Sequence, residues 1–89
     1  MPYYVHLRLH ADLIGVARVV RMLRRHSVRS TDLAIEPVPG RDEASVRGTF
    51  ALRRRVEALA AALVRTPCVA HAAIFHDSGV LLEFSRGSP

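Results

Sequence analysis

Histidine, cysteine and carboxylate side chains are the groups of this chain that could do acid–base, nucleophilic or metal chemistry, and their spacing argues against a catalytic site. His6 and His10 share one side of a predicted strand, but four residues of strand separate them by roughly 13 Å, too far to ligate one ion. A metal site would need His71, from a neighbouring strand, beside one of them. Cys68 is the single cysteine, so it has no disulfide partner within the chain and no CxxC motif. We predict no catalytic residue, no metal ligand and no cofactor.

Composition and charge indicate the class of protein but do not identify its binding partner. The 89 residues, 49% hydrophobic and 24% charged, are typical of one folded domain. No apolar run approaches the roughly 20 residues of a membrane-spanning helix, and the first ten residues lack the pattern of a secretory signal, so we expect a cytoplasmic protein. The net charge of +5 comes from thirteen arginines and no lysine. It fits an acidic partner or nucleic acid, and equally a GC-rich genome.

The periodicity of apolar residues indicates the elements that would position these groups. Alternation predicts strands over 3–10, 32–38, 44–52 and 69–75. Helical spacing predicts a helix that Asp12 caps and that ends near His26, and a second helix over 53–65. Residues 80–84 are compatible with a short fifth strand. Pro37 cannot donate to a strand ladder, so we expect the second strand at a sheet edge.

The first helix has one apolar side and one basic side. The basic side carries Arg18, Arg21 and Arg25. The side predicted to be buried consists of Leu13, Val16, Val19, Val20 and Leu23. In the weak second strand we expect Leu33 and Ile35 to point inward.

The order of elements predicts an α+β, ferredoxin-like βαββαβ sandwich, in which an antiparallel sheet of order 4-1-3-2 carries both helices on one face. We predict a domain over residues 1–79, with 80–89 as a C-terminal extension that forms an edge strand and a tail. The other face of the sheet has no helix to cover it. On that open face we predict Tyr4, Arg8 and Arg47 as partner-binding residues.

The same topology occurs in RNA-recognition motifs, which stack bases on aromatic side chains of the central strands. In the predicted third strand, Arg47 and Gly48 fit the motif, but Thr49 and Ala51 occupy the outward positions where aromatic residues belong. Tyr4 is then the one aromatic residue placed to stack. Nucleic acid is therefore a disfavoured partner.

Two runs of the sequence resemble a known family. Residues 18–26 (RVVRMLRRH) resemble the first helix of the ACT domains in the small, regulatory subunits of acetolactate synthase. The likeness is greatest to the short, single-domain subunit of the isozyme II type. Residues 68–74 (CVAHAAI) resemble the last strand of that subunit. The segments between the two runs match in length and order, so the resemblance covers about residues 3–76.

The resemblance implies a homodimer in which two ACT units join edge to edge or helix to helix and bind a branched-chain amino acid at their interface. Family members hold this effector in the loop before the first helix with an Asn and a Gly, which in the longer members form the pattern Asn-x-x-Gly, and the start of the other subunit's second strand contributes. One register places Ala11 and Ile14 at the Asn and Gly positions, and a shift of one residue places Asp12 and Gly15 there. An Asp in place of the Asn repels the effector's carboxylate unless it caps the helix or binds the ammonium group. The effector-binding residues that we predict on this basis are Ala11, Asp12, Ile14, Gly15, Val16, Arg29 and Ser30.

From the resemblance we expect a non-catalytic regulatory small subunit in branched-chain amino acid biosynthesis. Its partner would be the catalytic large subunit of a thiamine-diphosphate enzyme, acetolactate synthase, and its effector valine, leucine or isoleucine. Two alternatives remain open. One is a stand-alone amino-acid-sensing ACT module for another enzyme or a transcription factor, and the other is a basic RNA-binding module of the same topology.

Overall fold

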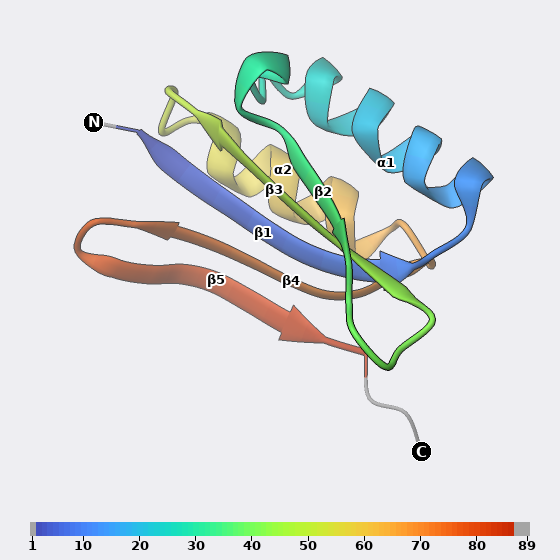
Figure 1. The fold of residues 1–89 in the computed structure, drawn as a ribbon. Helices are drawn as coiled ribbons and strands as arrows, with labels where there is room; N and C mark the ends of the chain where they lie inside the picture. The colour runs from blue at the N-terminus through green and yellow to red at the C-terminus, as the bar shows by residue number, and fades with distance from the viewer. Residues whose placement is uncertain (1, 87–89) are drawn as a thin grey trace.

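In the computed structural model, which describes residues 2–86, two helices cover one face of a five-stranded antiparallel sheet (Figure 1). The sheet order is β2-β3-β1-β4-β5. The predicted ferredoxin-like sandwich is confirmed, and the fifth strand lies beside β4. In chain order the elements are β1 (Tyr3–His10), α1 (Leu13–Arg25), the 3-10 turn η1 (Ser30–Asp32), β2 (Ala34–Pro37), β3 (Glu43–Phe50), α2 (Arg55–Val64), β4 (Val69–His76) and β5 (Gly79–Ser85).

Strand β1 runs through the centre of the sheet, between β3 and β4. Its inward residues Val5, Leu7 and Leu9 are at most 1% exposed. Because side chains alternate along a strand, the residues between them face the other side of the sheet, where they are half-buried. Val5 lies opposite Gly48 of β3 and Ile74 of β4, so one strand sets the register of both neighbours.

Helix α1 packs on the sheet through a row of residues spaced by four, Gly15, Val19 and Leu23. The prediction that Leu13 belongs to this row is wrong, because its side chain is 84% exposed. Successive helical residues are about 100° apart, so Leu13 lies about 200° from Gly15, on the far side of the helix. The helix is rotated relative to the predicted orientation, and Val16 and Val20 are only half-buried.

The edge strand β2 pairs with β3 alone, as Pro37 predicts. Leu33, just before the strand, is half-buried. Ile35 was also predicted to point into the core, but its side chain is 48% exposed, which corrects that prediction. The physical reason is its position at the sheet edge, where a four-residue strand has a neighbour on one side only.

Gly48 allows the chain that follows α1 to pack against β3. A Cβ at this position would lie 2.6 Å from Cγ1 of Val28, closer than packed atoms approach. The backbone N–H of Arg29 donates to the carbonyl of Thr49 at 2.9 Å and holds the same segment. Position 48 therefore requires a glycine, because Val28 and Arg29, which follow α1, pack directly against β3 there.

Strand β5 folds back onto β4 of its own chain, and the residue that follows it ties it to α2. The guanidinium of Arg86 donates from Nε to the carbonyl of Val69 at 2.8 Å and from Nη2 to the carbonyl of Thr66 at 3.2 Å. The same nitrogen Nη2 also donates to the carbonyls of Leu63 and Val64. The last turn of a helix has carbonyls without intrahelical donors, and Arg86 supplies a charged donor to them.

Replacing Arg86 with Ala should lower the free energy of unfolding by about 1–3 kcal/mol, because the carbonyls at the end of α2 lose a charged donor. Urea denaturation followed by circular dichroism measures the change. Arg18→Ala, which removes an exposed arginine of α1, is the control and should have almost no effect. Equal stability of the two variants would show that Arg86 does not anchor β5.

Candidate functional site

The loop before α1 is the predicted effector site, and it is held by backbone contacts on two sides. The N–H of His10 donates to the carbonyl of Cys68 at 3.3 Å, and the N–H of Ala11 donates to the carbonyl of Asp42 at 3.1 Å. The carboxylate of Asp12 accepts from the backbone N–H of Ile14 at 3.2 Å. Of the two roles left open for this carboxylate, the structure therefore shows helix capping.

The predicted effector residues do not share one environment. Gly15 is buried, and a Cβ there would lie 3.6 Å from Sγ of Cys68, an ordinary packing distance. Ile14, next to it, is 66% exposed. Arg29 and Ser30 lie beyond the other end of the 13-residue helix, about 20 Å away by helix rise. A single chain therefore brings Ala11, Asp12, Ile14 and Val16 together but not Arg29 and Ser30.

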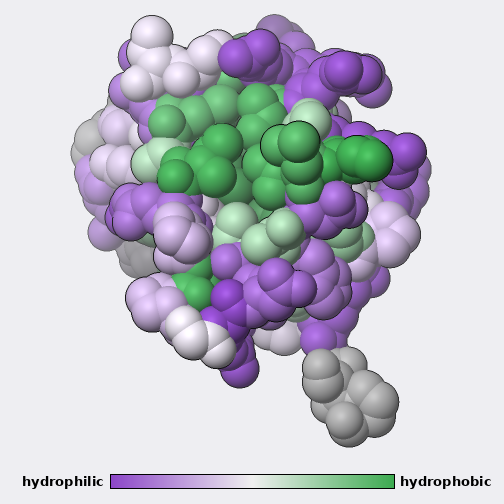
Figure 2. All heavy atoms as spheres, turned by 45° about the vertical axis from the view of Figure 1, so that its right-hand side comes forward, coloured by the Kyte–Doolittle hydropathy of each residue, from purple (hydrophilic) through white to green (hydrophobic). Residues whose placement is uncertain are grey.

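An apolar surface band runs along the side of the molecule where α1 begins and β2 passes (Figure 2). Leu13 and Ile14 of α1 and Ile35 of β2 are large apolar side chains that are 84%, 66% and 48% exposed. Single exposed apolar residues are ordinary, but a contiguous group indicates a surface that another molecule covers. We call the surface on which Ile35 is the exposed large apolar residue of β2 the α1–β2 band.

The open sheet face carries the three predicted partner-binding residues. Tyr4 and Arg8 lie on β1 and Arg47 lies on β3. Nη2 of Arg47 donates to Oε1 of Glu36 at 2.7 Å, so its charge is paired within the chain. The ring of Tyr4 stacks on Phe75 of β4, with ring centroids 5.3 Å apart.

Sequence reasoning missed Phe75 as a neighbour of Tyr4. The available signal was strand alternation, because Ile74 is buried and the next residue must face the other way. The two rings border a shallow hollow of about 490 Å³ that Arg47 and Thr49 also line. Tyr4 and Phe75 therefore form an aromatic pair at one end of the open sheet face.

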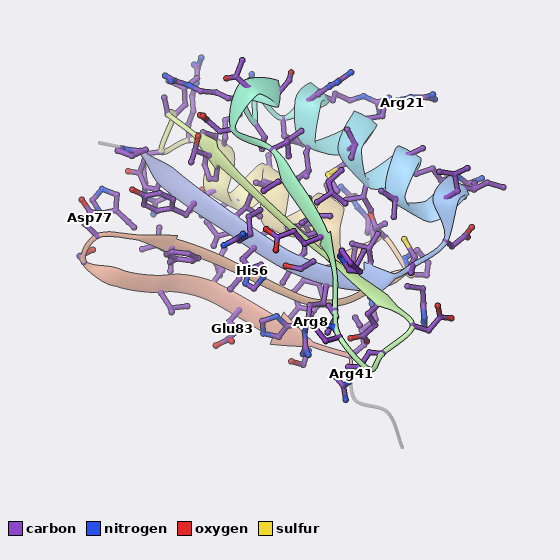
Figure 3. All side chains as sticks on the ribbon, in the orientation of Figure 1. His6, Arg8, Arg21, Arg41, Asp77 and Glu83 are labelled. Atoms are coloured by element: carbon purple, nitrogen blue, oxygen red, sulfur yellow. The ribbon has the colours of Figure 1, made fainter. Side chains whose placement is uncertain are left out.

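Two histidines of the sheet, His6 and His71, bind neighbouring side chains of the open face. Figure 3 shows His6, Arg8 and Glu83 on the side of the sheet away from the helices. Nε2 of His6 lies 2.9 Å from Oγ of Ser45, and Nε2 of His71 lies 3.0 Å from a carboxylate oxygen of Glu83. Across the described residues, no three His, Cys, Asp or Glu side chains lie close enough together to hold a metal ion.

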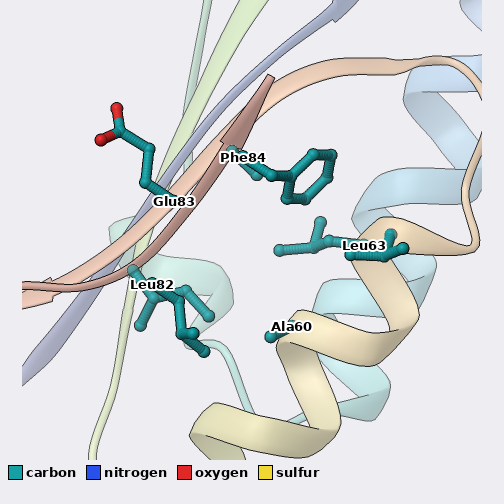
Figure 4. Close-up of a pocket in the computed structure, with 8 residues that line it drawn as sticks. Ala60, Leu63, Leu82, Glu83 and Phe84 are labelled. Carbon is teal, nitrogen blue, oxygen red and sulfur yellow. The ribbon is translucent and has the colours of Figure 1, made fainter. Parts of the chain in front are cut away.

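An apolar groove of about 120 Å³ lies between α2 and β5 (Figure 4). Ala60 and Leu63 line it from the helix, and Leu82 and Phe84 line it from the strand. The carboxylate of Glu83 points away from it (Figure 4). The groove offers shape and apolar contact but no charged group that would select a ligand.

Comparison with known proteins shows the fold. Neither a protein-family model nor a curated protein sequence matches this chain. An uncharacterized protein from Thermotoga maritima has a similar structure, with a TM-score of 0.66 and 13% identity over 83% of this chain and 92% of that one. The C-terminal domain of the MgtC protein from Mycobacterium tuberculosis is also similar, with a TM-score of 0.58 and 20% identity over 83% and 84% of the two chains.

A third similar structure is formyltetrahydrofolate deformylase from Burkholderia mallei, with a TM-score of 0.61 and 24% identity. The match covers 85% of this chain but 28% of the deformylase chain, so the likeness is to one part of that enzyme. The fold is ferredoxin-like and ACT-like. At these identities the likenesses concern the fold alone.

Neither helix within residues 2–86 is long and apolar enough to cross a membrane.

Two histidines should make stability depend on pH. Burial, then Arg47, His71 and Arg8, lowers the pKa of His6 below its ordinary 6.5. Burial, then nearby arginines, lowers the pKa of His26 in the same way. The unfolded chain therefore binds protons at these sites more readily than the folded chain. These two residues therefore lower the free energy of unfolding as the pH drops from about 6.5 through the lowered pKa values, and they have no such effect at higher pH.

We expect the double variant His6→Gln/His26→Gln to lose less stability than the wild type between about pH 7 and pH 5. Urea denaturation at several pH values measures this. His10→Gln, which changes an exposed histidine at the end of β1, is the control. Identical pH profiles of double variant and wild type would contradict the assignment.

Proposed function

We propose that this chain is a non-catalytic regulatory subunit of the ACT type, which binds the catalytic large subunit of a thiamine-diphosphate-dependent acetolactate synthase. The resemblance of residues 18–26 and 68–74 to the regulatory subunit supports the choice of partner. The ACT-like fold agrees with it. The role is regulation of an enzyme in branched-chain amino acid biosynthesis.

The observation that carries this proposal is the chemistry at the start of α1. The N-terminal end of a helix presents backbone N–H groups and a partial positive charge, which favour a carboxylate. Asp12 caps the N–H of Ile14 and so satisfies one of these donors. Beside them, the exposed side chains of Leu13 and Ile14 offer apolar contact. A branched-chain amino acid has one carboxylate and one apolar side chain, and it matches both features.

A homodimer would complete this site. Ile35 is an exposed apolar residue on the edge strand β2, and a second copy of the chain that joins along this edge would cover it and shield the effector's side chain from water. The family resemblance assigns the segment near Arg29 and Ser30 to the other subunit's effector site. This assignment agrees with the separation of the two segments within one chain.

Effector control would act as a coupling free energy between the α1 loop and the catalytic partner. Such couplings are typically about 1–3 kcal/mol, or roughly 5- to 150-fold in affinity. The alternative partner is another enzyme or a transcription factor, with the same loop as an amino-acid sensor. Binding of purified acetolactate synthase catalytic subunit separates these two candidates.

Calorimetric titration of the purified chain should detect saturable binding of valine, leucine or isoleucine, and no binding of serine. The physical reason is that serine has the carboxylate but no apolar side chain for Leu13 and Ile14. Replacing Ile14 with Asp should abolish binding, because it places a second carboxylate beside the effector's own. Absence of binding by all three amino acids would leave partner binding as the function and remove the sensor role.

Light scattering should show that Ile35→Asp shifts the protein from dimer to monomer without unfolding it, because a charge cannot be buried unpaired at the band. Leu52→Asp is the matched control, since Leu52 is a comparably exposed apolar residue outside the band, at 42% against 48%. A dimer that survives Ile35→Asp and dissociates with Leu52→Asp would place the interface elsewhere.

A further inference from the structure

The helical layer and the rest of this chain carry opposite formal charge. Residues 13–29 and 51–66, which contain α1, α2 and the loops beside them, hold nine arginines and one acidic residue, a charge of +8. The remaining residues hold four arginines and seven acidic residues, a charge of −3. The net +5 therefore combines a strongly cationic helical face with a weakly anionic sheet.

The arginines of the helical layer point into solvent. Eight of the nine are exposed, and Arg55 is half-buried. Figure 3 shows Arg21 extended from α1 away from the sheet. Among residues 2–86, Arg53 is the one member of this set in an ion pair, 3.1 Å from Glu57. Like charges held on one face repel each other, and an anionic partner would remove that repulsion.

Positive charge is concentrated where the end of α1 lies beside α2. His26, which follows α1, is within electrostatic reach of Arg25, Arg55 and Arg65. Nδ1 of His26 and Nε of Arg55 are buried, and neither has a hydrogen-bond partner among the described residues. A surface hollow of about 320 Å³ opens at Arg54 and Arg55. The cations here come from two helices and converge on one region.

The exposed side of α2 between Arg54 and Arg65 carries three apolar residues and Glu57, whose carboxylate pairs with Arg53. Ala58, Ala61 and Val64 are exposed and follow one another at three-residue spacing, which places them on one side of the helix. Arg54 precedes them and Arg65 follows them. A nucleic-acid backbone supplies phosphates but no apolar surface to cover the three residues. A protein helix that carries carboxylates beside apolar side chains supplies both.

We propose that the helical face docks an acidic, amphipathic surface of a protein partner. Carboxylates of the partner pair with the α1 arginines Arg18, Arg21 and Arg25, whose guanidinium groups can each hold a carboxylate with two hydrogen bonds. Apolar side chains of the partner cover Ala58, Ala61 and Val64 of α2. The identity of the partner as the catalytic subunit rests on the proposed function. The location of the contact does not, and it differs from the open sheet face predicted for Tyr4, Arg8 and Arg47.

Two triple variants with equal loss of charge test the location. The helix-face variant carries Arg18→Gln, Arg21→Gln and Arg25→Gln, and the sheet-side variant carries Arg8→Gln, Arg41→Gln and Arg47→Gln. Circular dichroism and urea denaturation establish that both are folded. Fluorescence anisotropy then measures their binding to a labelled helical peptide with a glutamate face beside a leucine strip, to single-stranded RNA, and to purified acetolactate synthase catalytic subunit.

We expect wild type to bind the peptide more tightly than the RNA, and the helix-face variant to bind the peptide at least about tenfold more weakly. The sheet-side variant should stay within about twofold of wild type. No peptide binding by wild type, equal loss in both variants, or tighter binding of RNA would overturn the proposal.

The catalytic subunit separates this proposal from the proposed function. If the catalytic subunit binds wild type but not the helix-face variant, the result supports both the docking surface and the proposed function. Binding that the helix-face variant keeps overturns the docking surface and leaves the regulatory role intact. If the catalytic subunit does not bind wild type, the proposed function fails, and the peptide titration still decides the docking surface.

Discussion

The burial of β1 between β3 and β4 is the constraint on which the rest of this structure depends. Val5, Leu7 and Leu9 are almost fully buried, and a register shift of one residue would turn all three to the solvent side. Both neighbouring strands align on β1, and both helices lie over the same face of the sheet (Figure 1). The loop that leaves β1 is therefore fixed at its base, where backbone bonds join it to Asp42 and Cys68.

From that fixed base, the rotation of α1 decides what the candidate effector loop presents. Gly15 lies against Cys68 and belongs to the same buried row as Val19 and Leu23. The same rotation leaves Leu13 and Ile14 exposed beside the start of the helix. Packing in the core thus creates the apolar surface from which an amino-acid-binding role is proposed.

The distribution of charge separates two kinds of surface. On the open sheet face, Arg47 pairs with Glu36, so its charge is compensated within the chain. In the helical layer, residues 13–29 and 51–66, a formal charge of +8 has one ion pair to compensate it. A charge that is paired within the chain produces little electric field outside the protein. A concentrated cationic face produces a stronger field, which attracts an anionic partner at moderate salt. The helical layer is for this reason the stronger candidate for an electrostatic contact.

The sequence alone determined the features that depend on neighbours within a few residues. Strand alternation around β1, the Asp12 cap on Ile14 and the edge position of β2 at Pro37 were all predictable, and with them the topology. The tertiary structure decided which side of α1 is buried, how Phe75 meets Tyr4, and where the Arg86 guanidinium binds at the end of α2. Each of these depends on contacts between residues far apart in the chain. Periodicity gives the spacing of side chains along an element, but the rotation and partners of that element follow from how the elements pack together.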